Sequence, residues 1–198
     1  MKKQRLEEGR RGGLNRTERW AALTCTVETA EKKFGMLSSS LAQKLFYLLQ
    51  EAGGAPLGYK FLMYTSGPYC SELWGDLDAL DQMGCLLLKP GRYGCGYEIR
   101  TTGFGRNLVA RHLASVSGFK EKAELILDLA GGSATGLKAL AFAFYVAKDR
   151  IAGKSDVPDA EVIAGVQKLA PRLDPDEISA ALRNLKVLLA SEISVGQR

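Results

Sequence analysis

The spacing of apolar residues most constrains the fold, because it changes twice along the chain. Leucines recur at steps of three and four between residues 41 and 49, which predicts an amphipathic helix. Between residues 59 and 64 aromatic and aliphatic side chains alternate in the manner of a strand. The helical spacing returns between residues 73 and 80. This order of helix, strand and helix predicts a mixed α+β fold that is mainly helical.

Capping residues place the ends of the first two helices. Asn15 and Glu18 have the N-cap and N3 spacing of a capping box, which predicts a helix over residues 16–33 that ends at Gly35. Serines 38, 39 and 40 are alternative caps for the second helix. The glycines at 53 and 54 are expected to end that helix.

The segment after Pro68 predicts a third helix. Cys70 or Ser71 is expected to cap it, with Ser71 offering the better oxygen acceptor. The apolar spacing stops at Leu80, and Gly84 is expected to end the helix.

Residues 85–89 and 97–100 read as two short strands joined by a link rich in glycine, proline and other turn residues. They predict a hairpin. Helices, a strand, a helix and a hairpin approximate a winged helix domain, with this hairpin as the wing. One departure is evident, since a winged helix has two helices between its first strand and the wing, whereas only one is predicted here.

The second half of the chain predicts helices throughout. Gly131 and Gly132 interrupt the apolar spacing, and Asp174, Pro175 and Glu177 mark the start of the last helix. We therefore expect three parts: a disordered basic arm over residues 1–14, a winged helix domain over 15–110 and an all-helical domain over 111–198.

Three segments resemble a known family: KLFYLLQEAGG, LGYKFLMYTSGPYCSELWGDLDALDQMGCLL and YEIRTTGFG. They are similar to a group of uncharacterised prokaryotic winged helix proteins, the YwgA-like family, and more distantly to the Panacea antitoxin domain. The matching residues are Lys44, Leu45, Tyr47, Leu48, Gly67, Pro68, Tyr69, Ser71, Glu72, Leu73 and Gly84. The family more often has serine where this chain has Cys70. The resemblance implies the fold of residues 20–110, and a regulatory role linked to DNA or to defence.

The net charge of +5 over 198 residues is unevenly distributed. Residues 1–20 carry seven basic and three acidic side chains, whereas the remainder is close to balanced. The excess therefore belongs to the N-terminal arm and not to the body of the protein.

The helix that would precede the wing carries acids on both sides of its apolar face and no lysine or arginine. Glu72 complements the helix dipole, but nothing local explains Asp78 and Asp81. Because phosphate is bound mainly by basic and neutral donors, this helix is a poor match to DNA. It is either a core helix with a solvated acidic surround or a surface for a partner protein or a second copy of the chain. The candidate partner face consists of Glu72, Gly75, Asp76, Ala79 and Gln82.

The leading hypothesis is thus a non-enzymatic regulatory or protein-interaction module built on a winged helix. The alternative is a DNA-binding regulator or antitoxin that contacts duplex DNA through its wing and arm. A solvated hairpin with a solubilising tail explains the same charges. The candidate DNA contacts are Arg10, Arg11, Arg16, Arg19, Lys89, Arg92, Tyr93 and Arg100.

Catalytic and metal chemistry have little support in the sequence. The four cysteines, at positions 25, 70, 85 and 95, lack the spacing of a zinc site, and His112 has no nucleophile or spaced acid beside it. We therefore expect a protein without enzymatic activity and without a bound cofactor or metal. No apolar run is long enough to cross a membrane, and the N-terminus lacks the apolar core of an export signal, so a cytoplasmic protein is expected.

Overall fold

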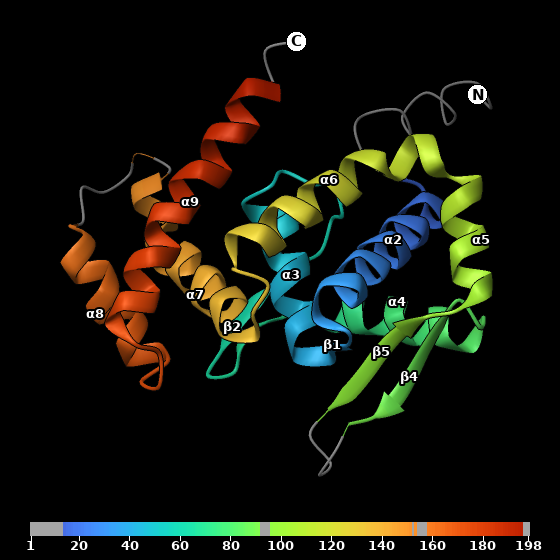
Figure 1. Cartoon of the computed structure of the whole chain (residues 1–198), viewed down its shortest axis with the longest axis horizontal. Coiled ribbons are helices and arrows are strands. Elements are labelled where there is room, and N and C mark those ends of the chain that lie inside the picture. The colour runs from blue at the N-terminus through green and yellow to red at the C-terminus, as the bar shows by residue number, and fades with distance from the viewer. Residues whose placement is uncertain (1–13, 92–95, 152, 154–157, 196–198) are drawn as a thin grey trace, which may run out of the picture.

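The computed structural model describes residues 14–91, 96–151, 153 and 158–195 (Figure 1). The chain begins with α2 (Arg16–Phe34), whose N-terminus has the predicted capping box between Asn15 and Glu18. Gly35 ends the helix with a left-handed φ of 72°. The first predicted helix is therefore confirmed, including both of its caps.

The second predicted helix is also confirmed. Helix α3 (Ser39–Glu51) begins after Ser38, whose side chain accepts a hydrogen bond from the backbone N–H of Leu41. Ser38 is thus the serine of the three that caps the helix. Immediately before it lies β1 (Leu37–Ser38), a two-residue strand that the sequence did not predict.

Strand β1 is the first strand of a three-stranded antiparallel sheet. The other two are β4 (Leu86–Pro90) and β5 (Tyr97–Thr101), which form the predicted hairpin, and the order across the sheet is β1–β5–β4. Leu37 lies opposite Ile99, so the sheet connects the segment between α2 and α3 to the hairpin. The hairpin projects from the lower edge of the molecule in Figure 1.

The strand predicted over residues 59–64 is shorter than expected and does not join this sheet. Only β2 (Leu62–Tyr64) forms, and it pairs with β3 (Gly67–Tyr69) in a separate two-stranded hairpin. The strand prediction is therefore confirmed for its second half only, and its pairing was not predicted because aromatic alternation marks an extended segment without identifying the strand with which it pairs.

Helix α4 (Ser71–Gln82) follows directly, with Cys70 at its N-cap position. No side chain caps this end, so the preference for Ser71 as the cap was wrong. Leu73, Leu77 and Leu80 are buried as their spacing predicts. The carboxylate of Asp81 accepts a hydrogen bond of 2.8 Å from the backbone N–H of Leu88 and so connects the end of α4 to β4.

The second half is helical, as predicted. Gly131 and Gly132, both with positive φ, separate α6 from α7, and Asp174 and Glu177 form hydrogen bonds that cap α9. His112 lies at the junction of α5 and α6 and not inside a helix. The helices are α5 (Gly103–Arg111), α6 (Leu113–Leu129), α7 (Ala134–Ile151), α8 (Asp159–Leu169) and α9 (Pro175–Val195).

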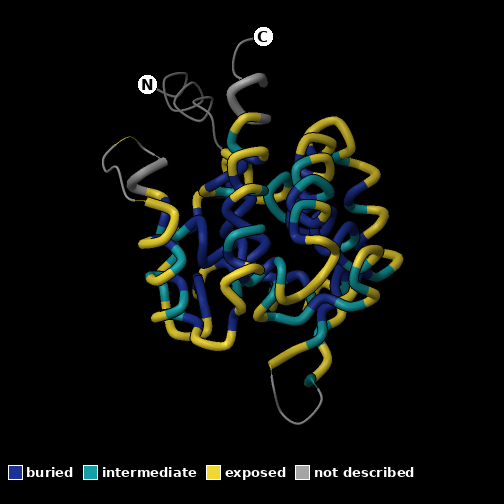
Figure 2. The backbone as a smooth tube through the Cα atoms, turned by 60° about the vertical axis from the view of Figure 1, so that its left-hand side comes forward, coloured by how far each residue is buried: buried dark blue, intermediate teal, exposed yellow. Residues whose placement is uncertain are grey.

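Buried side chains from both halves form one connected core. Helix α6 packs on α2 and α7 packs on α3, while α8 and α9 cover the outer side of α7 (Figure 1). The buried residues of the N-terminal and C-terminal helices belong to one cluster, and Figure 2 shows the buried positions in the interior with exposed positions outside them. The architecture is a mainly helical α+β fold with a small antiparallel sheet at one end.

Among the helices that the structure describes, no single one is long and apolar enough to cross a membrane. Helix α6 and residues 134–148 of α7 satisfy the length and composition requirement only as a pair, and they are bent by 102° relative to each other.

Candidate functional site

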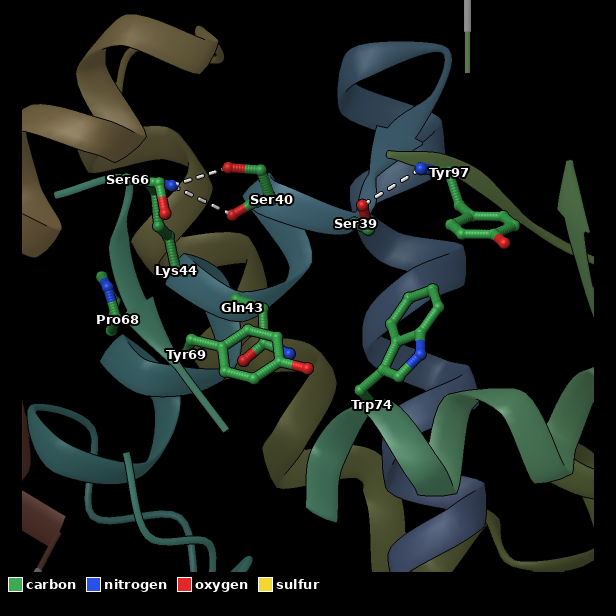
Figure 3. A pocket seen from close by; sticks show the side chains of 9 residues that line it. All are labelled: Ser39, Ser40, Gln43, Lys44, Ser66, Pro68, Tyr69, Trp74 and Tyr97. Atoms are coloured by element: carbon green, nitrogen blue, oxygen red, sulfur yellow. Dashed lines mark hydrogen bonds between the residues drawn. The ribbon is translucent and has the colours of Figure 1, made fainter. Parts of the chain in front are cut away.

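A pocket of about 280 Å³ opens where the N-terminus of α3 meets the β2–β3 hairpin, α4 and β5. Figure 3 shows Ser40, Ser66 and Lys44 on one side of the pocket and Trp74 and Tyr97 on the other, with Ser39 next to Tyr97 and Tyr69 between the two sides. The residues that line it are Ser39, Ser40, Gln43, Lys44, Ser66, Pro68, Tyr69, Trp74 and Tyr97. None of these side chains is acidic.

Lys44 is the charged residue of this pocket and is only 3% exposed. Its Nζ donates to the backbone carbonyl of Ser40 at 3.2 Å and to the Ser40 hydroxyl at 2.8 Å. Burial lowers the pKa of Lys44 from 10.5 to about 8, with a smaller contribution from the positive charge of Lys138. At neutral pH Lys44 is therefore a buried cation, and its hydrogen-bond acceptors are uncharged.

Lys44 also borders a second cavity of about 310 Å³ on the side of α7. The lining of this cavity again lacks acidic side chains among the described residues. It consists of Ser38, Ser40, Leu41, Lys44, Ala134, Thr135 and Lys138. Lys44 thus borders both cavities. Serine hydroxyl groups line each of them, and Lys138 is a second lysine in the lining of the second cavity.

Gly67 gives the Lys44 side chain the space it occupies. A Cβ atom at position 67 would lie 2.9 Å from Lys44 Cε and 3.1 Å from its Nζ. The backbone at Gly67 also has a φ of +116°, which side-chain-bearing residues rarely adopt. Both the backbone angle and the close contact therefore require glycine here.

Two glutamines of α3 fix the segment that carries the β2–β3 hairpin. The buried Gln43 side chain accepts from the Cys70 backbone N–H at 2.8 Å and donates to the Cys70 carbonyl at 3.1 Å. Seven residues further along the same helix, Gln50 makes the same pair of bonds to the backbone of Tyr59, each 2.7 Å long. Both ends of the segment between Tyr59 and Cys70 are thereby attached to one helix.

Five large apolar or aromatic side chains lie in or next to the pocket: Tyr69, Trp74 and Tyr97 line it, Leu62 and Tyr64 adjoin Tyr69 on the β2–β3 hairpin, and all but the half-buried Trp74 are exposed. Because Leu62 pairs with Tyr69 in the hairpin, these residues and Tyr64 share one face, and the Tyr64 and Tyr69 rings meet edge to face at 6.1 Å. On the opposite side, the Trp74 ring lies 5.2 Å from that of Tyr97, as Figure 3 shows. We call these five residues the aromatic rim.

The predicted partner face on α4 is only partly a surface. Glu72, Gly75 and Gln82 are exposed and Ala79 is half-buried. A Cβ atom on Gly75 would meet no atom within 4 Å, so this strip is open.

Asp76, the fifth residue of that face, instead points inward. Its carboxylate accepts from Trp20 Nε1 at 3.0 Å and from the Tyr59 hydroxyl at 2.7 Å, and it pairs with Arg19 Nε at 3.1 Å. The cluster joins α4 to α2 and raises the pKa of Tyr59, first through burial and then through Asp76 itself.

Asp76 and Asp81 thus have structural partners, and the Asp78 carboxylate accepts from Gln82 Nε2 at 2.7 Å. The expectation that nothing local explains Asp78 and Asp81 was wrong, because their partners come from the next helical turn and from β4.

The predicted DNA contacts are dispersed. Arg19 forms a salt bridge with Asp76, and the guanidinium of Arg16 stacks over the Trp20 ring, 4.4 Å from its centroid. Lys89 and Arg100 are exposed on the β4–β5 hairpin, but Lys89 lies opposite Glu98. Arg10, Arg11, Arg92 and Tyr93 lie outside the described residues.

The cysteines at 25, 70 and 85 are buried free thiols, and burial raises the pKa of Cys25 and Cys85. Cys95 lies outside the described residues. Within the described ranges, no three histidine, cysteine or acidic side chains come together in a way that could hold a metal ion.

The pocket was not predicted, although parts of its signal are present in the sequence. The sequence singles out Lys44 and Tyr69 only through the resemblance to the YwgA-like family, and no local pattern indicates a role for Gln43 or Gln50. Lys44 lies three residues after Leu41 and four before Leu48, which places it on the apolar side of the predicted helix and indicates burial.

No protein-family model matches this chain, and no curated protein matches it either. The resemblance to the YwgA-like family therefore stays a prediction.

Proposed function

We propose that this chain is a winged helix protein without enzymatic activity, which acts as a regulatory module by binding another protein, or a second copy of itself, at the aromatic rim. The observation that carries this proposal is the exposure of Leu62, Tyr64, Tyr69 and Tyr97 in and next to the pocket. We further propose that the protein works in the cytoplasm.

The order of elements supports the winged helix assignment. With β1 counted as the first strand, two helices, α3 and α4, precede the β4–β5 hairpin, and the strand order β1–β5–β4 suits that fold. The departure expected from the sequence is thereby removed. The β2–β3 hairpin between α3 and α4 is an addition to the basic pattern.

The composition of the rim supports protein binding. Leu62 is 62% exposed and Tyr64 is 52% exposed, although both could have been covered by the fold at a gain in free energy. Tyrosine and tryptophan contribute a large share of the binding energy at protein interfaces, most of all beside a pocket that excludes water. Glu72 and Asp78, exposed on α4, would repel the phosphates of DNA approaching this side.

The alternative proposal is a DNA-binding regulator or antitoxin that uses the β4–β5 hairpin and the N-terminal arm. Its support within the described residues is the exposure of Lys89 and Arg100 on that hairpin.

The rim can be tested with matched substitutions. We expect the double variant Leu62→Ser/Tyr64→Ser to weaken association by roughly thirtyfold or more, the loss typical of interface anchors. The control is Leu113→Ser on α6, because Leu113 has the same 62% exposure as Leu62 but lies outside the rim. Sedimentation equilibrium measures self-association, and quantitative affinity capture with the wild-type and variant chains measures binding to a partner.

Equal recovery with the wild-type and double variant chains, together with monomeric sedimentation of both, would contradict the proposal. A third arm measures binding to duplex DNA at increasing salt. Tight, salt-sensitive binding that Lys89→Ala and Arg100→Ala weaken would instead favour the DNA-binding alternative.

A further inference from the structure

We infer that the pocket beside Lys44 is a carboxylate-binding subsite, which receives an acidic group at the end of a side chain or chain terminus of the protein bound at the rim. The inference rests on the proposed function, since it assigns the chemistry of the group that the rim guides into the pocket.

The first support is the charge of the pocket. The Lys44 ammonium group is buried, and both bonds described for it go to neutral oxygens of Ser40. A buried cation without an opposite charge is unfavourable, so a carboxylate that enters the pocket gains a strong electrostatic partner. An ammonium group has three N–H donors, and among the described residues Lys44 uses two of them for Ser40.

The second support is the set of neutral donors beside Lys44. The N-terminus of α3, with Ser39 and Ser40 of its first turn, forms this wall of the pocket and carries the positive end of the helix dipole, although the Leu41 N–H is already capped by Ser38. The Ser39 hydroxyl oxygen accepts from the Tyr97 N–H at 3.1 Å, which leaves its own proton free to donate.

The third support is the shape of the pocket, which favours a carboxylate over a DNA phosphate. Lys44 lies below the surface, and about 280 Å³ is space for a single side chain and not for a large ligand. A phosphodiester is flanked by sugars on both sides, whereas a carboxylate stands at the tip of its group and can project inward. The rings of Tyr69, Trp74 and Tyr97 would cover the apolar part of that group.

Three short peptides test the inference and distinguish the source of the carboxylate. One is acetyl-Tyr-Phe with a free C-terminus, the second is its C-terminal amide, and the third is acetyl-Phe-Glu-Phe amide. NMR titration of the full chain would follow the Trp74 indole N–H and the Tyr97 amide at pH 7. We expect at least one acidic peptide to bind about tenfold or more tightly than the neutral amide.

The variants separate the charge of Lys44 from the shape of the pocket. Lys44→Met should abolish the preference for an acidic peptide while preserving the fold, because it replaces a buried cation with an apolar side chain of similar length. Lys60→Met, which removes an exposed lysine outside the pocket lining, should leave the preference unchanged.

The pH gives a second readout. The groups that face Lys44 from other elements are Lys138 on α7, Tyr69 on β3 and Tyr97 on β5. Because Lys44 loses its proton above a pKa of about 8, raising the pH from 7 to 9.5 should weaken binding of the acidic peptide by roughly tenfold or more.

Equal binding of acidic and neutral peptides, no binding of either, or an unchanged preference in Lys44→Met would each overturn the inference. Its failure is distinguishable from failure of the proposed function. Peptide binding without rim-dependent association would contradict the proposed function alone, whereas rim-dependent association without any carboxylate preference would contradict the subsite alone.

Discussion

Lys44 lies at a position where a neutral side chain would be more stable. Its charge is buried beside Ser40 and Gly67, and its pKa is lowered from 10.5 to about 8. The difference between these pKa values corresponds to roughly 3 kcal/mol of destabilisation of the charged form, as an upper value. A residue with this effect on stability has a reason to be present other than packing.

Lys44→Met is therefore expected to increase the free energy of unfolding at pH 7 by about 1–3 kcal/mol, measured by urea denaturation. The unfolded chain binds more protons at Lys44 than the folded chain between about pH 8 and pH 10.5, so wild-type stability rises across this range. The advantage of the variant should accordingly be largest below pH 8 and disappear toward pH 10.5. A loss of stability at pH 7 would contradict this account of Lys44.

At the scale of elements, α3 supports the whole insertion between Tyr59 and Cys70 through Gln43 and Gln50. These residues are seven apart and so lie on one side of the helix. Gln43 binds both the N–H and the carbonyl of Cys70, and Gln50 binds the same two groups of Tyr59. Each glutamine thus makes the pair of backbone hydrogen bonds that a neighbouring strand would otherwise make. The hairpin therefore keeps its position although it belongs to no larger sheet.

Gln43→Leu is expected to lower the free energy of unfolding by about 1–3 kcal/mol, because it leaves the buried N–H of Cys70 without its partner, whereas the Cys70 carbonyl keeps its bond from the Trp74 N–H. Gln50→Leu is the matched comparison, with a smaller loss of about 1–2 kcal/mol, since Gln50 is only half-buried and water can replace its bonds. Urea denaturation of both variants measures the two losses. Equal stability of Gln43→Leu and the wild type would refute the role given to Gln43.

Elements whose signals are local were predictable from the sequence. The capping box of Asn15 and Glu18, the glycine at 35 and the β4–β5 hairpin all match the structure. Strand β1 was missed because two residues carry no periodicity, and its pairing with Ile99 connects distant parts of the chain. The pocket was missed for the same reason, since Lys44, Tyr69 and Tyr97 meet only after folding.

At the scale of the whole molecule, the two proposed parts, residues 15–110 and 111–198, share one core. The apolar face of α2 is covered by α6, and that of α3 by α7. Phe142 of α7 reaches Gly67 and so lies behind the pocket itself. Helix α7 therefore packs against β3, which borders the pocket, and contributes Thr135 and Lys138 to the second cavity.

A fragment that ends at His112 is expected to lack a cooperative unfolding transition, because it exposes the apolar side chains that α6 and α7 cover. Circular dichroism with thermal denaturation checks this expectation. Co-expression of residues 113–198 should restore the transition, and this serves as the control. Cooperative unfolding of the short fragment alone would show that the first part folds independently.

The start of α2 and the end of α9 lie in the upper half of Figure 1, whereas the β2–β3 and β4–β5 hairpins lie in its lower half. A tether attached at either terminus would hold the chain on a sensor surface with the hairpins directed into solution. Immobilisation through the N-terminus and through the C-terminus should then give the same peptide affinities. The agreement or disagreement of the two orientations offers an internal check on any binding constant measured for the pocket.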